Sequence, residues 1–319
     1  MEFGPCGGVG PDGRCEVADH PCSFLDAPTA RWEGAPVAAV LHPAAAALRD
    51  RLARGRVVVA DLPAEPLSAA GIAECAELLH DRVDAVLCGD SGSARVQFPP
   101  AYRARLVQEA GLTAWSGLNN RDRNRVAIEG ELAALADAGA AAVHCVTGDH
   151  TDSGHRPDAK PVFDLDSTRT TALARSFGHL VSVGESPAAP PVARRPARLL
   201  EKQRAGAEVC FVDHCGSAEP VRRFVAEAHD LGVSTTFIAC VPVVVDQRSA
   251  DVLASFPGIV LPAGYLDRIV SASDAREAGI AAAVTLAEEM LAVDGVTGVN
   301  LSGWAPAEAL AEIGRRLGG

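Results

Sequence analysis

The feature that most constrains the fold is an alternation of short apolar runs with amphipathic segments between residues 56 and 303. Apolar runs of this length, bounded by polar residues, are typical of β-strands that are buried on both faces. The eight runs are RVVVAD (56–61), DAVLCGD (84–90), LTAWSGL (112–118), AAVHCVTGD (141–149), HLVSVGE (179–185), AEVCFVDH (207–214), VSTTFIACVPV (233–243) and TGVNLSG (297–303).

Amphipathic segments separate these runs. In LSAAGIAECAELLHDR (67–82), Ile72, Ala76 and Leu79 fall on one face of a helix. Parallel strands need crossover connections, so this alternation predicts a parallel sheet covered by helices. The other predicted helices are VAIEGELAALADAG (126–139), STRTTALARSF (167–177), PARLLEKQRAG (196–206), EPVRRFVAEAHDLG (219–232) and AGIAAAVTLAEEMLAVDG (278–295).

Eight strand–helix units in about 260 residues match the length of a (β/α)8 barrel. A doubly wound open sheet is the alternative, but no G-x-G-x-x-G sequence follows the first predicted strand to support dinucleotide binding. We therefore expect an α/β fold with a TIM barrel over residues 35–319 and a short cysteine-rich extension over residues 1–30. Active groups in such a barrel lie at the C-terminal ends of the strands.

Polar side chains collect at that end of several predicted strands. Each one alone could be a helix cap or a solvated loop residue, because Asp and Asn favour both places. Capping explains the set less well, since Asp–His and Gly–Asp pairs come directly after buried strands. The set consists of Asp61, Asp90, Asn119, Asn120, Arg121, Asp122, Asp149, His150, Glu185, Asp213, His214, Asp246 and Asn300.

Composition excludes several classes of function. The net charge is −12 and the sequence has no long basic run, so nucleic-acid binding is not expected. No apolar run approaches the roughly 20 residues that span a bilayer, and the N-terminus lacks a signal-peptide pattern. We expect a soluble cytoplasmic protein with no membrane partner. Six of the nine cysteines are spread through the body of the chain, where buried reduced thiols explain them most simply.

The other three cysteines crowd into the first 22 residues. Cys6, Cys15 and Cys22, with His20 nearby, offer thiolate and imidazole ligands of the kind that zinc prefers. An iron–sulfur cluster would need a fourth ligand, usually cysteine, which this segment lacks. The spacing C-x8-C-x6-C is not a common zinc pattern, so a flexible tail with incidental thiols is the alternative.

The segment NNRDRNRVAIEGELAALADAGAAAVHCVTGD (119–149), followed by GHRPDAKPVFDLDS (154–167), resembles the methylenetetrahydrofolate reductase family. Three further segments resemble that family: LLEKQRAGAEVCFVD (199–213), FPGIVLP (256–262) and DGVTGVNL (294–301). The N-terminal segment 4–22, which begins GPCGGVGPDGRCEV and ends with Pro21 and Cys22, resembles a cysteine-rich segment of accessory domains found with some bacterial members. The resemblance implies a (β/α)8 barrel that binds FAD, with NADH as a candidate electron donor.

The same resemblance implies an oxidoreductase, in which reduced flavin passes a hydride to 5,10-methylenetetrahydrofolate and gives 5-methyltetrahydrofolate. It places Asp149 beside flavin and folate as the first catalytic candidate, and Gly148 where the backbone approaches the cofactor. The residues expected to bind the cofactor are Thr147, Gly148, Asp149, Phe163, Asp166 and Lys202. Asp166 could equally be the N-cap of the helix that begins near Ser167, and Lys202 a solvated helix residue.

The sequence departs from the family pattern at several strand ends. The glutamate that the family uses as its acid is replaced by Ala60, so Asp61 could substitute only if the strand end shifts by one residue. After the fifth predicted strand, Glu185 is the only acid. We expect Asp61 and Glu185 to be catalytic together with Asp149. The residues expected to bind the substrate are Asn119, Asp213 and Asp246.

These departures leave two other functions open. One is a flavin-free enzyme of folate-linked one-carbon chemistry. The other is a non-catalytic subunit, in which the cysteine segment docks a second protein. The expected partners are a tetrahydrofolate derivative, and a partner protein or a second copy of the chain.

Overall fold

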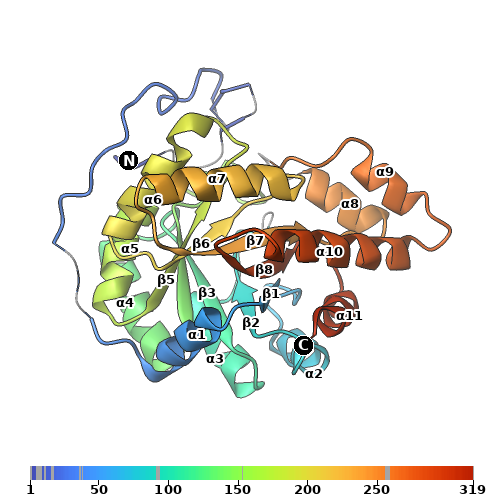
Figure 1. Ribbon diagram of the computed structural model, residues 1–319. Helices are drawn as coiled ribbons and strands as arrows, with labels where there is room; N and C mark the ends of the chain where they lie inside the picture. The colour runs from blue at the N-terminus through green and yellow to red at the C-terminus, as the bar shows by residue number, and fades with distance from the viewer. Residues whose placement is uncertain are drawn as a thin grey trace.

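The computed structural model describes residues 2–4, 9–10, 12–15, 18–35, 37, 39–90, 94–152, 154–255 and 259–318. Its eight strands are all parallel and close into a barrel in sequence order, with β8 paired to β1 (Figure 1). The predicted (β/α)8 barrel is therefore confirmed. The strands are β1 (Val57–Asp61), β2 (Ala85–Cys88), β3 (Ala114–Asn119), β4 (Ala142–Val146), β5 (Leu180–Glu185), β6 (Val209–Val212), β7 (Thr236–Pro242) and β8 (Val296–Ser302).

Helices surround the barrel and connect its strands. All six helices predicted from the sequence are present, with ends that differ by a few residues, and α8 and α9 form an additional pair after β7 (Figure 1). The helices are α1 (Pro43–Ala53), α2 (Ala69–Leu79), α3 (Pro100–Glu109), α4 (Arg125–Asp137), α5 (Ser167–Ser176), α6 (Arg195–Arg204), α7 (Ala218–Asp230), α8 (Gln247–Ala254), α9 (Tyr265–Val270), α10 (Ala275–Leu291) and α11 (Ala307–Leu317), with a 3-10 turn η1 (Val192–Arg194) before α6.

The interior of the barrel is filled only at its N-terminal half. Helix α1 covers that end with Leu48 and Leu52, which pack with inward-facing strand residues. The indole ring of Trp115 lies edge-on to the Phe211 ring, with 5.0 Å between the ring centroids. These side chains form a packed floor, and the C-terminal half of the barrel above it is hollow.

The N-terminal extension packs against the C-terminal end of the barrel, beside α5 and α6. The Trp32 backbone N–H donates to Glu201 Oε2 at 2.7 Å, and Arg194 donates to the Ala27 carbonyl. Val9 is buried and reaches the hollow end of the barrel. The extension therefore covers part of the opening before the chain runs down the side of the barrel to α1 (Figure 1).

No helix in the described part of the chain is long and apolar enough to cross a membrane. The six cysteines of the barrel are free thiols, as the sequence predicts. Four of them are buried as expected, namely Cys88, Cys145, Cys210 and Cys215, whereas Cys75 and Cys240 are only partly buried.

Candidate active site

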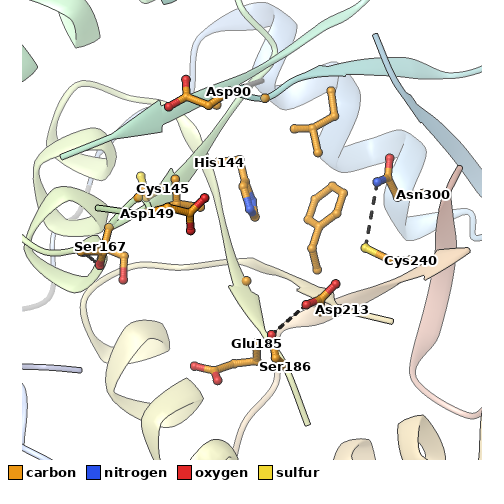
Figure 2. A pocket seen from close by; sticks show the side chains of 18 of the residues that line it. Asp90, His144, Cys145, Asp149, Ser167, Glu185, Ser186, Asp213, Cys240 and Asn300 are labelled. Carbon is orange, nitrogen blue, oxygen red and sulfur yellow. Dashed lines mark hydrogen bonds between the residues drawn. The ribbon is translucent and has the colours of Figure 1, made fainter. Parts of the chain in front are cut away.

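A cavity of about 480 Å³ lies at the C-terminal end of the barrel, where the predicted polar residues converge (Figure 2). Each of the eight strands contributes to its wall, and the residues that follow the strands supply most of the charge. The charged residues that line it are Asp61, Asp90, Arg121, Asp149, Glu185, Arg195, Arg198, Lys202 and Asp213.

Asp61, the last residue of β1, changes its protonation near neutral pH. Burial raises the pKa of its carboxyl to about 6, and the negative charge of Asp213 contributes in the same direction. Asn300 on β8 opposes this rise, because its amide donates to Asp61 Oδ1 at 3.0 Å. A carboxyl with such a pKa can accept a proton and return it at physiological pH.

Asp213 and His214 follow β6 on the same side of the cavity. The Ser186 hydroxyl donates to Asp213 Oδ2 at 3.0 Å (Figure 2). Burial lowers the pKa of His214, although the charge of Asp213 opposes this, and the ring lies 2.9 Å from the Ser302 hydroxyl through Nε2. Its Nδ1 has no hydrogen-bond partner among the residues that the structure describes.

Glu185, at the end of β5, is held as a permanent anion by side chains of α6. Its side chain is fully buried, with Lys202 Nζ at 2.6 Å from Oε1 and Arg195 Nη1 at 3.3 Å from Oε2. Burial alone would raise the pKa of Glu185, but the charges of Lys202, Arg198 and Arg195 lower it to about 2. Glu185 is therefore unsuited to proton transfer at neutral pH.

Arg198 is the third cation that α6 presents beside Glu185. Its Nε and Nη1 atoms are buried, and neither has a hydrogen-bond partner in the described part of the chain. A Cβ added to Gly4 would overlap Nη2 of Arg198, so the N-terminal extension lies directly over this guanidinium. Buried donors without acceptors are costly, by about 1–3 kcal/mol each. Arg198 thus presents unused donors beside the cavity that it lines.

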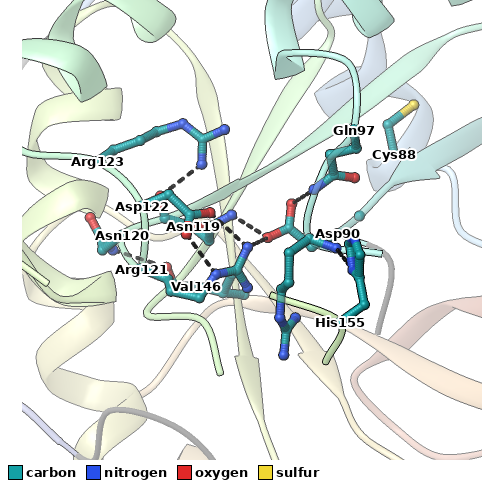
Figure 3. A network of polar contacts seen from close by, with 12 residues as sticks. Cys88, Asp90, Gln97, Asn119, Asn120, Arg121, Asp122, Arg123, Val146 and His155 are labelled. Atoms are coloured by element: carbon teal, nitrogen blue, oxygen red, sulfur yellow. Dashed lines mark hydrogen bonds and ion pairs between the residues drawn. The ribbon is translucent and has the colours of Figure 1, made fainter. Parts of the chain in front are cut away.

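A polar network joins the loops after β2 and β3 at the opposite rim (Figure 3). Arg121 is buried and forms ion pairs with Asp90 at 3.2 Å and Asp122 at 2.7 Å. The amides of Gln97 and Asn119 also donate to Asp90. Asp90 and Arg121 therefore satisfy each other, unlike Arg198.

His144 on β4 projects into the middle of the cavity (Figure 2). Burial and the charge of Lys202 lower its pKa to about 4, so the ring is neutral at pH 7. Its Nδ1 lies 2.9 Å from the Ser182 hydroxyl on β5, and its ring meets that of Phe211 at a centroid distance of 5.0 Å. Phe211 is the only Phe, Tyr or Trp among the described lining residues.

The structure brings together most of the residues that the sequence predicts for the site. Three of the others have structural partners outside the cavity wall: Asp166 caps the N-terminus of α5, Asp246 caps that of α8, and the Phe163 ring stacks on His150. Buried Asn119 also lies behind the wall, bonded to Asp90. The residues that line the cavity as predicted are Asp61, Thr147, Gly148, Asp149, Glu185, Lys202 and Asp213.

Gly148 has a local reason to be glycine. Its φ of 91° lies in the region that favours glycine, and an added Cβ would stand 3.1 Å from the Asn119 Cβ and 3.3 Å from the Arg121 Cβ. The loop after β4 can therefore pass close to the loop after β3.

Sequence reasoning missed Arg198 and His144. The one signal for His144 is an imidazole within an otherwise apolar strand, AAVHCVTGD. For Arg198 the signal is weaker, because a basic residue in PARLLEKQRAG fits a solvated helix face equally well.

The expected zinc site is wrong as far as Cys15, Cys22 and His20 are concerned, because these three side chains do not form a ligand cluster. In the described ranges no group of three or more His, Cys, Asp and Glu side chains could hold a metal ion. Cys15 and Cys22 are free thiols, and the exposed His20 directs Nδ1 at the Pro21 carbonyl, 2.7 Å away. Cys6 lies outside the described residues.

No family model matches the sequence, and no curated protein matches it. Solved structures do resemble the fold. An oxaloacetate acetylhydrolase aligns over 86% of this chain and 85% of its own, with a TM-score of 0.53 and 13% identity. A 2,3-dimethylmalate lyase, described as a PEP mutase/isocitrate lyase superfamily member, aligns over 88% and 82%, with a TM-score of 0.50 and 14% identity.

These comparisons correct the assignment made from the sequence. The similar structures are a lyase and a hydrolase, so the expected methylenetetrahydrofolate reductase membership and the flavin-dependent oxidoreductase activity on folate are wrong. The expected FAD and NADH cofactors are wrong with them. A partner protein or a second copy of the chain stays a prediction, because neither is tested.

Proposed function

We propose that this protein is an enzyme of the lyase or hydrolase type that breaks a carbon–carbon bond in a small dicarboxylic acid. Oxaloacetate and 2,3-dimethylmalate, which appear in the names of the similar structures, are both acids of this kind. The observation that carries the proposal belongs to this chain. One cavity contains Arg198, with two donor atoms that have no acceptor among the described residues, and Asp61, with a pKa near 6.

The cations of α6 are suited to bind a substrate carboxylate. Lys202 and Arg195 are paired with Glu185, whereas Nε and Nη1 of Arg198 have no acceptor in the part of the chain that the structure describes. The planar fork of a guanidinium matches the two oxygens of a carboxylate. Three cations against one anion leave this wall with a local positive balance, whereas the rest of the lining is mainly acidic. An anion in the cavity is therefore attracted to the side of α6. Binding would also remove the cost of the unsatisfied donors of Arg198.

Asp61 is suited to move the proton of the reaction. In a lyase reaction its carboxylate takes the proton of a substrate hydroxyl, and that oxygen forms a carbonyl as the carbon–carbon bond breaks. In a hydrolase reaction it takes the proton of the attacking water instead. In both, the electron pair of the broken bond moves into the departing fragment as an enolate. Asp61 then returns the proton to the carbon of that fragment, which restores the enzyme.

The test is an assay of the full chain with oxaloacetate and 2-alkylmalates, following release of oxalate or of a 2-oxo acid. It is run with and without added Mg²⁺, so that a divalent requirement does not hide activity. Arg198→Gln should raise KM by tenfold or more, because a charged hydrogen bond contributes about 1.5–3 kcal/mol.

The matched control is Arg222→Gln, which removes an exposed arginine of α7 that is paired with Glu219. It should leave KM unchanged. If the wild type turns over none of these dicarboxylic acids, the proposed function is contradicted. Equal KM values for Arg198→Gln and Arg222→Gln would contradict the assignment of the carboxylate site.

A further inference from the structure

His144 belongs to a chain of three hydrogen-bonded side chains on neighbouring strands. Trp115 on β3 and Ser182 on β5 are both fully buried, and Ser182 pairs in register with His144 on β4. The Trp115 Nε1–H donates to Ser182 Oγ at 2.8 Å, and the same oxygen lies 2.9 Å from His144 Nδ1. The chain runs from the floor of the barrel to the cavity.

This geometry determines which nitrogen of His144 has the hydrogen. An indole N–H can only donate, so the Ser182 oxygen accepts from Trp115. The hydrogen of the Ser182 hydroxyl then needs an acceptor, and the only other hydrogen-bond contact of that hydroxyl in the described chain is His144 Nδ1. The reverse arrangement would leave a buried hydroxyl hydrogen without an acceptor, at a cost of about 1–3 kcal/mol. His144 Nδ1 is therefore the acceptor, and the ring hydrogen is on Nε2.

The surroundings of His144 keep the ring uncharged and leave Nε2 accessible. Burial and the nearby Lys202 charge lower the pKa of His144 to about 4. On the next strand Gly184 has no side chain, and a Cβ added there would stand 3.7 Å from Nε2. The glycine thus leaves room for a ligand atom beside the N–H.

We propose that His144 is a catalytic hydrogen-bond donor, whose Nε2–H binds the oxygen on which negative charge develops when the carbon–carbon bond breaks. This role rests on the proposed function of the cavity. The electron pair of the broken bond becomes an enolate, and a fixed neutral N–H stabilises its oxygen without transferring a proton. Asp61 takes and returns the proton, so His144 neither gains nor loses one during turnover.

The first test does not depend on any substrate. Nitrogen NMR of the full chain with labelled histidine should show His144 with hydrogen on Nε2 and none on Nδ1 between pH 5 and pH 8. Ser182→Ala should release this constraint and give a mixture of the two forms. Hydrogen on Nδ1, or a charged ring at pH 7, would overturn the proposal whether or not the protein turns over a dicarboxylic acid.

The second test uses oxalate, a planar dianion that has two charged oxygens on one carbon, as the enolate of a carboxylate has. Binding of oxalate to the labelled wild type should shift the signal of His144 Nε2–H. Binding without a shift would overturn the role of His144 and leave the proposed function standing. Failure of oxalate to bind would contradict the anion site of the proposed function, and the donor role would fall with it.

Kinetics provide the third test. His144→Leu should lower kcat about a hundredfold to a thousandfold, as loss of one oxyanion donor does elsewhere, and change KM little. His144→Gln keeps an amide N–H on its side chain and should retain more of the activity. His80→Gln, an exposed histidine beside Asp81, is the matched control. Wild-type kcat in His144→Leu would overturn the proposal.

Discussion

Asp61 lowers the stability of the fold in the state in which it can act as a base. Its pKa is raised from 3.8 to about 6, so the folded chain binds this proton more tightly than the unfolded chain does. The stabilising effect of the bound proton is complete below pH 3.8 and is lost as the pH rises through 6. Above pH 6 the cavity therefore contains a carboxylate that destabilises the fold.

Replacing Asp61 by asparagine should separate these two effects. At pH 8 we expect Asp61→Asn to have a free energy of unfolding higher than the wild type by on the order of 2 kcal/mol, and so to unfold at a higher temperature. Near pH 3.5 it should show no such gain. Its kcat should fall at least about a hundredfold, because the general base is gone. Wild-type kcat/KM should rise with pH through about 6.

Thermal unfolding at both pH values and a pH–rate profile check these outcomes, and the exposed Asp230→Asn is the control. A pH-independent change in stability for Asp61→Asn would contradict the raised pKa.

At the scale of elements, strand β5 and helix α6 are joined by one carboxylate. Glu185 contacts Lys202 and Arg195, and its pKa is lowered to about 2. The unfolded value is near 4.5, so this carboxylate stabilises the fold fully above pH 4.5, and the contribution is lost as the pH falls toward 2.

Glu185→Gln should therefore lower the free energy of unfolding by about 3–5 kcal/mol at pH 7, because it leaves buried cations unpaired. The difference from the wild type should shrink at pH 3. Urea unfolding at both pH values measures it. Glu219→Gln, which breaks the exposed pair with Arg222, should change stability by less than about 1 kcal/mol. Equal effects of the two substitutions would show that the contact of β5 with α6 is not held by charge.

The N-terminal extension contributes to the candidate active site. All eight strands and α1 lie after residue 42, whereas Val9 lines the cavity and Gly4 lies over Arg198. Removing residues 1–33 should leave the barrel folded but weaken oxalate binding, because Arg198 becomes solvated and no longer needs a ligand. Circular dichroism and calorimetric titration test this. Unchanged affinity in a folded, shortened chain would show that the extension is not part of the site.

At the scale of the whole molecule, the barrel could be predicted from the sequence because its evidence is repeated eight times. Each strand is apolar on both faces and each long helix has one apolar face, so several weak patterns agree. The carboxylates at the strand ends could be predicted for the same reason, since Asp61, Asp149 and Asp213 follow apolar runs directly.

The positions of the cation Arg198 and of the neutral His144 in the site could not be predicted in this way. Whether Arg198 faces water or a cavity depends on how α6 is rotated against β5, and whether His144 faces inward depends on the register of β4. Both depend on tertiary packing, which a local sequence pattern does not predict. The family assignment failed for a related reason. The strand and helix segments of two barrels can have similar sequences although the side chains at the C-terminal ends of their strands differ.

The packed floor of the barrel has an optical consequence. The chain has three tryptophans, of which Trp115 is fully buried directly beneath the cavity, while Trp32 and Trp304 are partly exposed. Ser182 and His144 link the Trp115 indole N–H by hydrogen bonds to the cavity. A ligand that accepts the hydrogen bond of His144 Nε2 changes the polarisation of that chain. We therefore expect the emission of Trp115 to report occupancy of the site from within the protein, without a label and before the reaction is known.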